Sequence, residues 1–464
     1  MESSSKGLSR RRFLTLAGAG AAAMALPIDL SAAEVRKPNI IVILSDDHGY
    51  ASIGCQGGVN VPTPNIDSIA KNGIRCTSGY VTCPVCGPTR AGLMTGRYQQ
   101  RFGFEDNDGP RPTAPANFGL PEGEKTMADY LKAEGYATCM IGKWHLGHRP
   151  KCHPQKRGFD EFFGFTNAAH SYVNPGVGTA IPIVRGTEPV DEKEYLTDAF
   201  GREAVSFIER HKEKPFFLHL AFNAVHHPLD VPERFKDAFP EIAEPEQRKF
   251  ATLLTAMDEA VGKVLDKVRE AGLERDTLIF FLGDNGGYRL PGDFAPNAPL
   301  RGFKLHVYEG GVRVPYLVQW KDKLPAGKVY DKIVTSLDIL PTAVTAAGGK
   351  PAEIVEGVDL VPYLLGRKRE APHDRVFWRW IDRYAARVGD WKLVMNGNGD
   401  VWTLMENETG KEQLFNLKDD IGETKDLAAV YPEKLKELQA AYREWDAKNI
   451  PPKWFDGRRK PNAR

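Results

Sequence analysis

The sequence predicts an α/β protein with a large, mainly parallel sheet between helices, followed by a smaller antiparallel sheet that packs against a helix. Three observations predict this class: short continuous apolar runs, amphipathic stretches that alternate with them, and a change to strand-like segments near the C-terminus. The 464 residues are enough for one large and one smaller domain.

Four apolar runs are followed by turn residues, as expected for buried strands. They span residues 39–44, 137–141, 216–222 and 278–282. Their continuous hydrophobicity is typical of a sheet covered on both faces. Helical patterns lie between them at residues 125–134, 200–212 and 248–271. Because strands and helices alternate, we expect most strands to be parallel.

The composition changes after residue 349, where Pro, Gly and charged residues dominate to about residue 372. The next segments read as strands at 375–380, 391–395, 400–404 and 414–417, followed by an amphipathic helix at 432–448. We therefore predict a large domain over residues 34–370 and a C-terminal subdomain over residues 371–464.

The first 33 residues have the pattern of an export signal. The letters SRRRFL at residues 9–14 precede an apolar run at 16–26, and a plausible cleavage region lies at 31–33. This resembles a twin-arginine signal peptide. The alternative is a membrane anchor, but the run is shorter than the roughly 20 apolar residues that a spanning helix needs. We expect the twin-arginine machinery to export the protein to the periplasm or the medium.

Charge and cysteine content narrow the function. Lysine plus arginine (62) nearly balances aspartate plus glutamate (61), so no global field attracts nucleic acid. All six cysteines lie before residue 153, and an oxidising compartment permits some of them to pair. The sequence does not determine which cysteines would pair.

Polar clusters follow each of the four predicted strands. They are Asp46-Asp47-His48, Lys143-Trp144-His145, His226-His227 and Asp284-Asn285. Ligands of open α/β sheets bind outside the carboxyl ends of strands, so one site is expected to gather all four clusters. Three carboxylates and a carboxamide suit Ca²⁺ or Mg²⁺ better than zinc. The alternative for each cluster is a turn or a helix cap.

Cys86 admits three interpretations. A redox dithiol with Cys83 is one, although the flanking residues show no thioredoxin-like arrangement. A cysteine-phosphatase loop needs five residues between Cys and Arg. Arg90 is separated from Cys86 by three residues and from Cys83 by six, so this interpretation fails.

The third interpretation rests on Cys86-x-Pro88-x-Arg90 with TGR at residues 95–97, which resembles the signature of the formylglycine-dependent (type I) sulfatases, relatives of alkaline phosphatase. Cys83 lacks the proline two residues on. Further stretches resemble motifs of that family in the expected order: SDDHGY (45–50), TPNID (63–67), GKWHLG (142–147), FNAVHHP (222–228), GDNG (283–286), Lys304, YEGGVR (308–313) and LFNL (414–417).

The resemblance implies an alkaline-phosphatase-like fold and an enzyme that hydrolyses sulfate monoesters. It also implies that a formylglycine-generating enzyme oxidises Cys86 to formylglycine (3-oxoalanine). The metal would be one Ca²⁺, held by Asp46, Asp47, Asp284 and Asn285 and touching residue 86.

The resemblance also implies catalytic roles. Arg90 and Lys143 hold the hydrated formylglycine, and His145 is the base that collapses the sulfated intermediate. His226 and Lys304 hold the sulfate and protonate the leaving alcohol. His227 is the alternative to His226 in this role, but the His-x-Pro spacing favours His226.

The expected substrate is a sulfated carbohydrate or an aryl sulfate. Candidate specificity residues lie on presumed loops: Glu105, Asp106, Asn107, Asp108, His170, Tyr172, Asn174, Arg379, Trp380 and Arg383. The alternative for Trp380 is packing at the domain interface. Two other functions stay open, a phosphonate monoester or phosphodiester hydrolase and a calcium-dependent glycan-binding protein. No second complete ligand set for a two-zinc phosphatase is evident.

Overall fold

The computed structural model describes residues 36–58, 61–107, 117–173, 182–291, 296–396 and 410–454. The predicted signal peptide, the strand at 400–404, Asp108 and Asn174 lie outside these ranges. Among the helices that the structure describes, none combines the length and the apolar character needed to cross a membrane.

Ten of the described strands form one sheet, and its centre is parallel. Strands β9, β1, β8, β4 and β5 are mutually parallel neighbours, β10 is antiparallel to β9, and β6 is antiparallel to β5. In spatial order the strands are β11 (Lys328–Tyr330), β2 (Ile74–Cys76), β10 (Tyr316–Trp320), β9 (Thr277–Gly283), β1 (Asn39–Ser45), β8 (Phe216–Ala221), β4 (Ala137–Lys143), β5 (Glu161–Phe165), β6 (Val184–Arg185) and β7 (Glu188–Pro189). The four predicted strands are thus neighbours at the centre.

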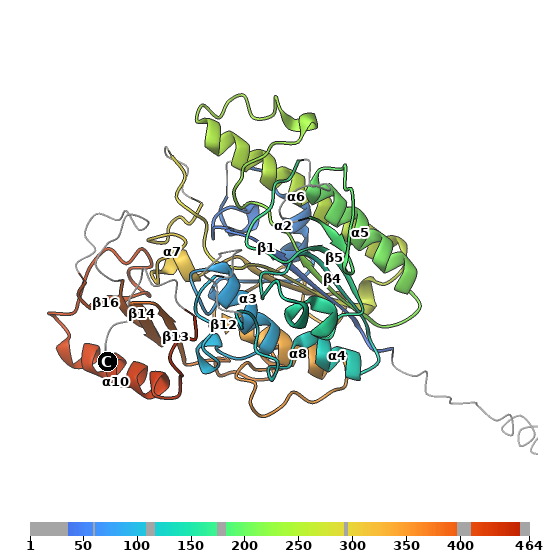
Figure 1. Ribbon diagram of the computed structural model, residues 1–464. Helices are drawn as coiled ribbons and strands as arrows, with labels where there is room; N and C mark the ends of the chain where they lie inside the picture. Colours follow the sequence, from blue (N-terminus) through green and yellow to red (C-terminus); the bar gives the residue numbers. More distant parts are fainter. Residues whose placement is uncertain are drawn as a thin grey trace, which may run out of the picture. The chain divides into compact units, whose positions relative to one another are not determined.

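Helices cover both faces of this sheet (Figure 1). Ile41 and Ile43 of β1 pack in a core with α2 (Pro64–Lys71), α5 (Leu196–His211) and α6 (Pro245–Glu270). Ile40, Val42 and Leu44 pack on the opposite face with α3 (Cys86–Thr95), α4 (Met127–Ala133) and α8 (Ile339–Ala346). Alternate residues of the same strand therefore reach two apolar cores, which explains its continuous hydrophobicity.

A four-stranded antiparallel sheet follows near the C-terminus. It contains β13 (Arg375–Trp380), β14 (Arg383–Val388), β15 (Trp391–Met395) and β16 (Gln413–Asn416), in that order. Phe377, Ala386 and Leu393 pack beneath α10 (Pro432–Asp446), whereas Trp378 and Phe415 pack against Tyr80 and Tyr308 of the preceding region. Both predicted sheets are confirmed. The exact domain boundary stays a prediction.

Short elements complete the described chain. Strands β3 (Gly79–Tyr80) and β12 (Val334–Thr335) pair with each other, and two short helices are α7 (Glu309–Val312) and α9 (Val361–Leu364). A buried ionic cluster joins α7 to the C-terminal sheet. In it the Lys392 ammonium lies 2.8 Å from Glu309 and 3.1 Å from Glu423.

Candidate active site

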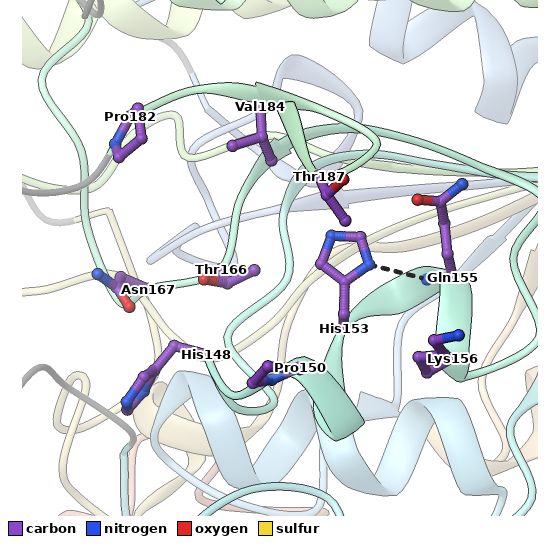
Figure 2. A pocket seen from close by; sticks show the side chains of 10 residues that line it. All are labelled: His148, Pro150, His153, Gln155, Lys156, Thr166, Asn167, Pro182, Val184 and Thr187. Carbon is purple, nitrogen blue, oxygen red and sulfur yellow. Dashed lines mark hydrogen bonds between the residues drawn. The ribbon is translucent and has the colours of Figure 1, made fainter. Parts of the chain in front are cut away.

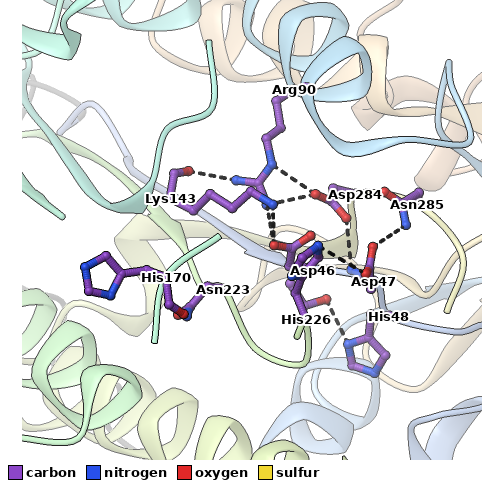
Figure 3. Close-up of polar contacts among 12 residues, drawn as sticks. Asp46, Asp47, His48, Arg90, Lys143, His170, Asn223, His226, Asp284 and Asn285 are labelled. Atoms are coloured by element: carbon purple, nitrogen blue, oxygen red, sulfur yellow. Dashed lines mark hydrogen bonds and ion pairs between the residues drawn. The ribbon is translucent and has the colours of Figure 1, made fainter. Parts of the chain in front are cut away.

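The four polar clusters meet at the carboxyl ends of β1, β4, β8 and β9, as expected. Asp46 and Asp47 follow β1, Lys143 is the last residue of β4, His226 follows β8 and Asp284 follows β9. Figure 3 shows Arg90, Lys143 and Asp284 converging on Asp46. Residues more than 200 positions apart in the sequence thus form one site.

Two glycines allow the backbone to pack closely around this site. A side chain at Gly142, whose φ is 106°, would place its Cβ 1.9 Å from the Ala221 carbonyl oxygen of the neighbouring strand. A Cβ at Gly286 would lie 1.8 Å from the Gly310 carbonyl oxygen. Such distances exclude any side chain, which explains why glycine precedes Lys143 and follows Asn285.

Arg90 and Lys143 neutralise the inner carboxylates. The Lys143 ammonium donates to Asp46 Oδ2 at 2.5 Å. Arg90 donates through Nε to Asp284 Oδ2 at 2.9 Å and through Nη1 to the Lys143 carbonyl at 2.7 Å. All four side chains are almost completely buried. Burial and the charge of Asp46 raise the pKa of Asp284 to about 6.

Asp47 is the outer carboxylate, and Lys304, Asn285 and His226 surround it. Lys304 Nζ lies 2.8 Å from Asp47 Oδ2, Asn285 Nδ2 lies 2.8 Å from Oδ1, and His226 Nε2 lies 3.6 Å from Oδ2. Burial alone would raise the pKa of Asp47, but the charges of Lys304 and His226 and the hydrogen bonds from Lys304 and Asn285 together outweigh burial and lower the pKa well below its usual range. Asp47 is therefore ionised at neutral pH.

His226 and His227 face different surroundings. His226 Nδ1 lies 2.6 Å from the His227 carbonyl oxygen, so its other nitrogen faces Asp47. The His227 ring instead packs on Tyr288, with 4.5 Å between ring centroids. The structure thus places His226, and not its neighbour, in the cluster. His145 is fully buried, and its carbonyl oxygen lies near Gly87.

Cys86 is the first residue of α3 and is 1% exposed. Its Sγ atom and ligand atoms of Asp46, Asp47 and His226 all lie within 4.8 Å of one another. Burial raises the pKa of the Cys86 thiol to about 12, although Lys143 and Lys304 act in the opposite direction. At neutral pH this thiol is protonated, so it is a weak nucleophile in this form.

The dithiol interpretation of Cys83 and Cys86 finds no support. Neither cysteine forms a disulfide, and Cys83 packs with Val85 and Trp380 in a small apolar cluster. Burial raises the pKa of Cys83 well above its usual value. Catalytic dithiols need a thiolate of lowered pKa, which these surroundings do not provide.

The donor atoms fit a hard divalent cation. Asp46 Oδ1 and Asn285 Oδ1 are buried, and neither has a hydrogen-bond partner among the described residues. Unpaired buried oxygens are costly, and a metal would satisfy both. Three carboxylates (Asp46, Asp47, Asp284) face three cations (Arg90, Lys143, Lys304), so a divalent ion would leave the centre with a positive charge that attracts an anion.

Several predicted specificity residues have structural contacts instead. Arg379 pairs with Glu105 and with Asp446, and Trp380 packs against Cys83. Arg383 donates to the backbone carbonyls of Leu305 and Asn396. For Trp380, the geometry favours packing at the interface over binding of a sugar. Through Cys83, Glu105 and Leu305, these contacts join the C-terminal sheet to the large domain.

The sequence did not reveal the role of Asn107. Its Oδ1 accepts a hydrogen bond from the backbone N–H of Gly87 at 2.9 Å, so it satisfies a free donor in the first turn of α3, next to Cys86. His48 also has a structural contact, because its Nδ1 lies 2.8 Å from Ser45 Oγ and its ring packs edge-on against Phe281.

These features define a class of enzyme. The carboxyl edge of the parallel sheet combines oxygen ligands for a divalent metal, buried cations and one nucleophile position. This arrangement suits the hydrolysis of an anionic ester, because the cations stabilise the charge of the ester.

Comparisons with known proteins specify the class. The sulfatase family model, described as Sulfatase, matches residues 38–349, and the model N-sulphoglucosamine sulphohydrolase, C-terminal, matches residues 303–441. N-acetylgalactosamine-6-sulfatase of Canis lupus familiaris is 30% identical, over 92% of this chain and 87% of that protein. The chain belongs to the sulfatase family and is a sulfuric ester hydrolase.

Solved structures agree on the fold. Ps i-CgsB in complex with k-i-k-neocarrahexaose superposes with a TM-score of 0.82 at 35% identity, over 90% of this chain and 95% of that one. A phosphonate monoester hydrolase from Silicibacter pomeroyi has a TM-score of 0.65 at 17% identity, over 89% and 96% of the two chains. At that identity the second likeness concerns the fold alone.

Proposed function

We propose that this sulfatase removes sulfate from sulfated carbohydrates, using a formylglycine made from Cys86 and one bound Ca²⁺. The observation that carries the proposal is the position of Cys86. It begins α3, is buried, and has its sulfur within 4.8 Å of ligand atoms of Asp46, Asp47 and His226. A thiol with a pKa of about 12 is a poor nucleophile there, so a modified residue 86 accounts better for the site.

Formylglycine in its hydrated form supplies one hydroxyl to attack sulfur and a second whose deprotonation releases the sulfate. The residues around position 86 have matching roles in the proposal. Arg90 and Lys143 hold the hydrated side chain and balance its charge, since both are buried beside Asp46 and Asp284. His145 accepts the proton from the second hydroxyl.

His226 and Lys304 act on the other side of the ester. Lys304 holds a sulfate oxygen. The contact of His226 Nδ1 with the His227 carbonyl places the ring proton on Nδ1, so Nε2 is the atom that exchanges a proton with the ester oxygen. Burial and the charge of Lys304 lower the pKa of His226 to about 3, and the negative charge of a bound sulfate would raise it again.

Asp46, Asp47, Asp284 and Asn285 are the proposed calcium ligands. Oxygen donors of this kind suit Ca²⁺, and the ion would polarise the sulfate and lower the pKa of a hydroxyl on residue 86. The two unpaired buried oxygens, Asp46 Oδ1 and Asn285 Oδ1, support a cation at this position.

The carbohydrate substrate is supported by relatives. The canine relative is an N-acetylgalactosamine-6-sulfatase, and Ps i-CgsB was solved with k-i-k-neocarrahexaose. The SRRRFL segment at residues 9–14 supports export by the twin-arginine machinery to the periplasm or the medium. Because that route carries folded proteins, the formylglycine-generating enzyme would oxidise Cys86 in the cytoplasm.

The test compares ester classes. Protein produced with a formylglycine-generating enzyme is assayed for sulfate release from 4-nitrophenyl sulfate and from sulfated oligosaccharides, and in parallel on 4-nitrophenyl phosphate and a phosphonate monoester. We expect turnover of sulfates to exceed that of the phosphorus esters, and Cys86→Ala to abolish it. Rapid phosphonate turnover without sulfate release would overturn the proposal in favour of a phosphonate hydrolase.

A further inference from the structure

A pocket of about 650 Å³ lies beyond the residues described above (Figure 2). Its volume is within the roughly 300–1,000 Å³ typical of small-molecule sites. Asn167 and His148 lie on one side of it in Figure 2, and Gln155 and Lys156 lie on the other. Pro150, Pro182 and Val184 add apolar surface to its wall.

One end of the pocket lies at the same edge of the sheet as the active site, and the rest extends along β5 and β6. Strand β5 is parallel to β4, and Phe165 is the register partner of Lys143. The backbone N–H of Trp144 bonds to the Phe165 carbonyl at 3.0 Å. Thr166 and Asn167, which line the pocket, come directly after that residue, and His148 follows His145 by three residues. The pocket therefore begins one strand, about 5 Å, from the strand that carries Lys143.

Two side chains of the pocket lack partners that a ligand would supply. Asn167 is 5% exposed, and its Oδ1 has no hydrogen-bond partner within the described part of the chain. Lys156 is exposed, and its ammonium forms no ion pair with any described residue. A buried amide oxygen calls for a hydroxyl or amide donor, and an unpaired ammonium attracts an anion.

The wall of the pocket is held firmly. His153 Nε2 lies 3.0 Å from the Gly186 carbonyl oxygen, its Nδ1 accepts from the Gln155 N–H at 3.3 Å, and its ring packs edge-on against Phe162. A wall fixed in this way keeps its shape before a ligand arrives, which lowers the entropic cost of binding.

We propose that this pocket binds the sugar unit next to the sulfated one, so that the enzyme acts on sulfated oligosaccharides in preference to single sulfated sugars. The inference rests on the proposed function. Apolar surface beside hydroxyl-binding groups suits a pyranose ring, and Lys156 suits a second sulfate or a carboxylate on that unit. Because Thr166 and Asn167 follow the register partner of Lys143, the pocket begins near enough to the active site for one carbohydrate chain to reach both.

The experiment measures kcat/KM on 4-nitrophenyl sulfate and on a series from the sulfated monosaccharide to the hexasaccharide of the best polysaccharide substrate. For the wild type we expect kcat/KM to rise with chain length. Lys156→Ala and Asn167→Ala should each lower the ratio of hexasaccharide to aryl sulfate kcat/KM about tenfold, the effect of losing one hydrogen bond to a charged or buried group.

Two further variants complete the design. Thr187→Trp fills the pocket from an exposed position and should lower the same ratio. Lys151→Ala removes a positive charge from the same segment, where Lys151 pairs with Glu122 outside the pocket, and should leave the ratio unchanged. A ratio that stays constant in all three pocket variants, with sulfate still released, overturns the inference alone. Absence of sulfate release from every ester overturns the proposed function as well.

Discussion

The hydroxyl of Tyr172 donates to the carbonyl oxygen of His226, at 2.9 Å. The same hydroxyl lies 2.5 Å from the carbonyl oxygen of Asn223, so it holds both ends of the short turn that presents the His226 ring. Tyr172 is completely buried and stacks on Tyr195. The residue that the sequence suggested for substrate specificity is thus a positioning residue for the proposed proton donor.

Removing this hydroxyl should affect the chemical step. Tyr172→Phe removes the one proton that the hydroxyl shares between the two carbonyls, of which Asn223 still accepts from the His226 N–H, and keeps the ring stack, so we expect kcat to fall about tenfold with little change in KM. Tyr136→Phe is the control, because the Tyr136 hydroxyl donates to the Pro38 carbonyl at the amino end of β1. A loss of stability in both variants with unchanged kcat would show that Tyr172 has only a structural role.

Calcium should stabilise the fold. Binding only to the folded state adds about 2.7 kcal/mol to the free energy of unfolding at one hundred times Kd, so Ca²⁺ should raise Tm after chelator treatment. Asn285→Ala removes one oxygen ligand without leaving a lysine unpaired and should abolish most of this rise. Thermal unfolding with and without Ca²⁺ measures it, and an equal rise in the variant would exclude Asn285 as a ligand.

Removing only the lysine from the buried ionic cluster should lower the stability of the fold. Lys392 lies between Glu309 and Glu423, and all three are fully buried. Lys392→Met would leave two neighbouring carboxylates with less compensation, and we expect it to lower the free energy of unfolding by about 3–5 kcal/mol. Adding Glu423→Gln to that variant should restore part of the loss in urea unfolding. Equal stability of the single variant and the wild type would contradict this account.

His373 should make stability depend on pH. Its Nε2 lies 2.7 Å from Asp338 Oδ1. Burial lowers the pKa of His373, but the charge of Asp338, the hydrogen bond to it and the charge of Asp374 together outweigh burial, so the pKa lies above its usual value. A raised pKa stabilises the fold fully below the unfolded pKa of about 6.5, and this stabilisation is lost as pH rises through the folded pKa.

The matched variant for this prediction is His373→Gln, which keeps a donor but carries no charge. Its free energy of unfolding should fall below that of the wild type at pH 6 and approach it at alkaline pH, where the wild-type histidine is neutral. Urea unfolding across this range measures the difference. A difference that grows with pH would have the wrong sign for a protonated His373.

The central fold could be predicted because its physical cause is local. Strand β1 is apolar at its five central positions, 40–44, since both faces are covered, and that signal is present in consecutive residues of the sequence. Strand β14 had no such signal. It contains Arg383 and Arg387, which are buried because one donates to backbone carbonyls and the other to the Tyr80 hydroxyl. Such partners lie far away in the sequence and cannot be predicted from it.

In the candidate site too, some residues could be predicted from the sequence and others could not. The carboxylates and Lys143 follow strands, so the rule for carboxyl ends of parallel strands brings them together. Asn107 and Tyr172 act through contacts with backbone groups 20 and more than 50 positions away. No spacing in the sequence indicates these pairings, because the backbone partners carry no residue signature.

The two cysteines of the motif, Cys83 and Cys86, have different surroundings, and we expect them to differ in function. Cys83 packs with Val85 and Trp380, and its Sγ is outside the set formed by Cys86, Asp46, Asp47 and His226. Cys83→Ala should therefore retain most sulfatase activity and lose about 1 kcal/mol of stability or more, as small cavities do. Loss of activity equal to that of Cys86→Ala would restore the dithiol interpretation.

The central claim is that residue 86 acts as formylglycine, and mass spectrometry of the peptide that contains it tests this most directly. In protein purified from the native host, we predict an aldehyde in place of the Cys86 thiol, together with an unmodified Cys83 in the same peptide. An unmodified cysteine at position 86 in protein that still releases sulfate would contradict the account.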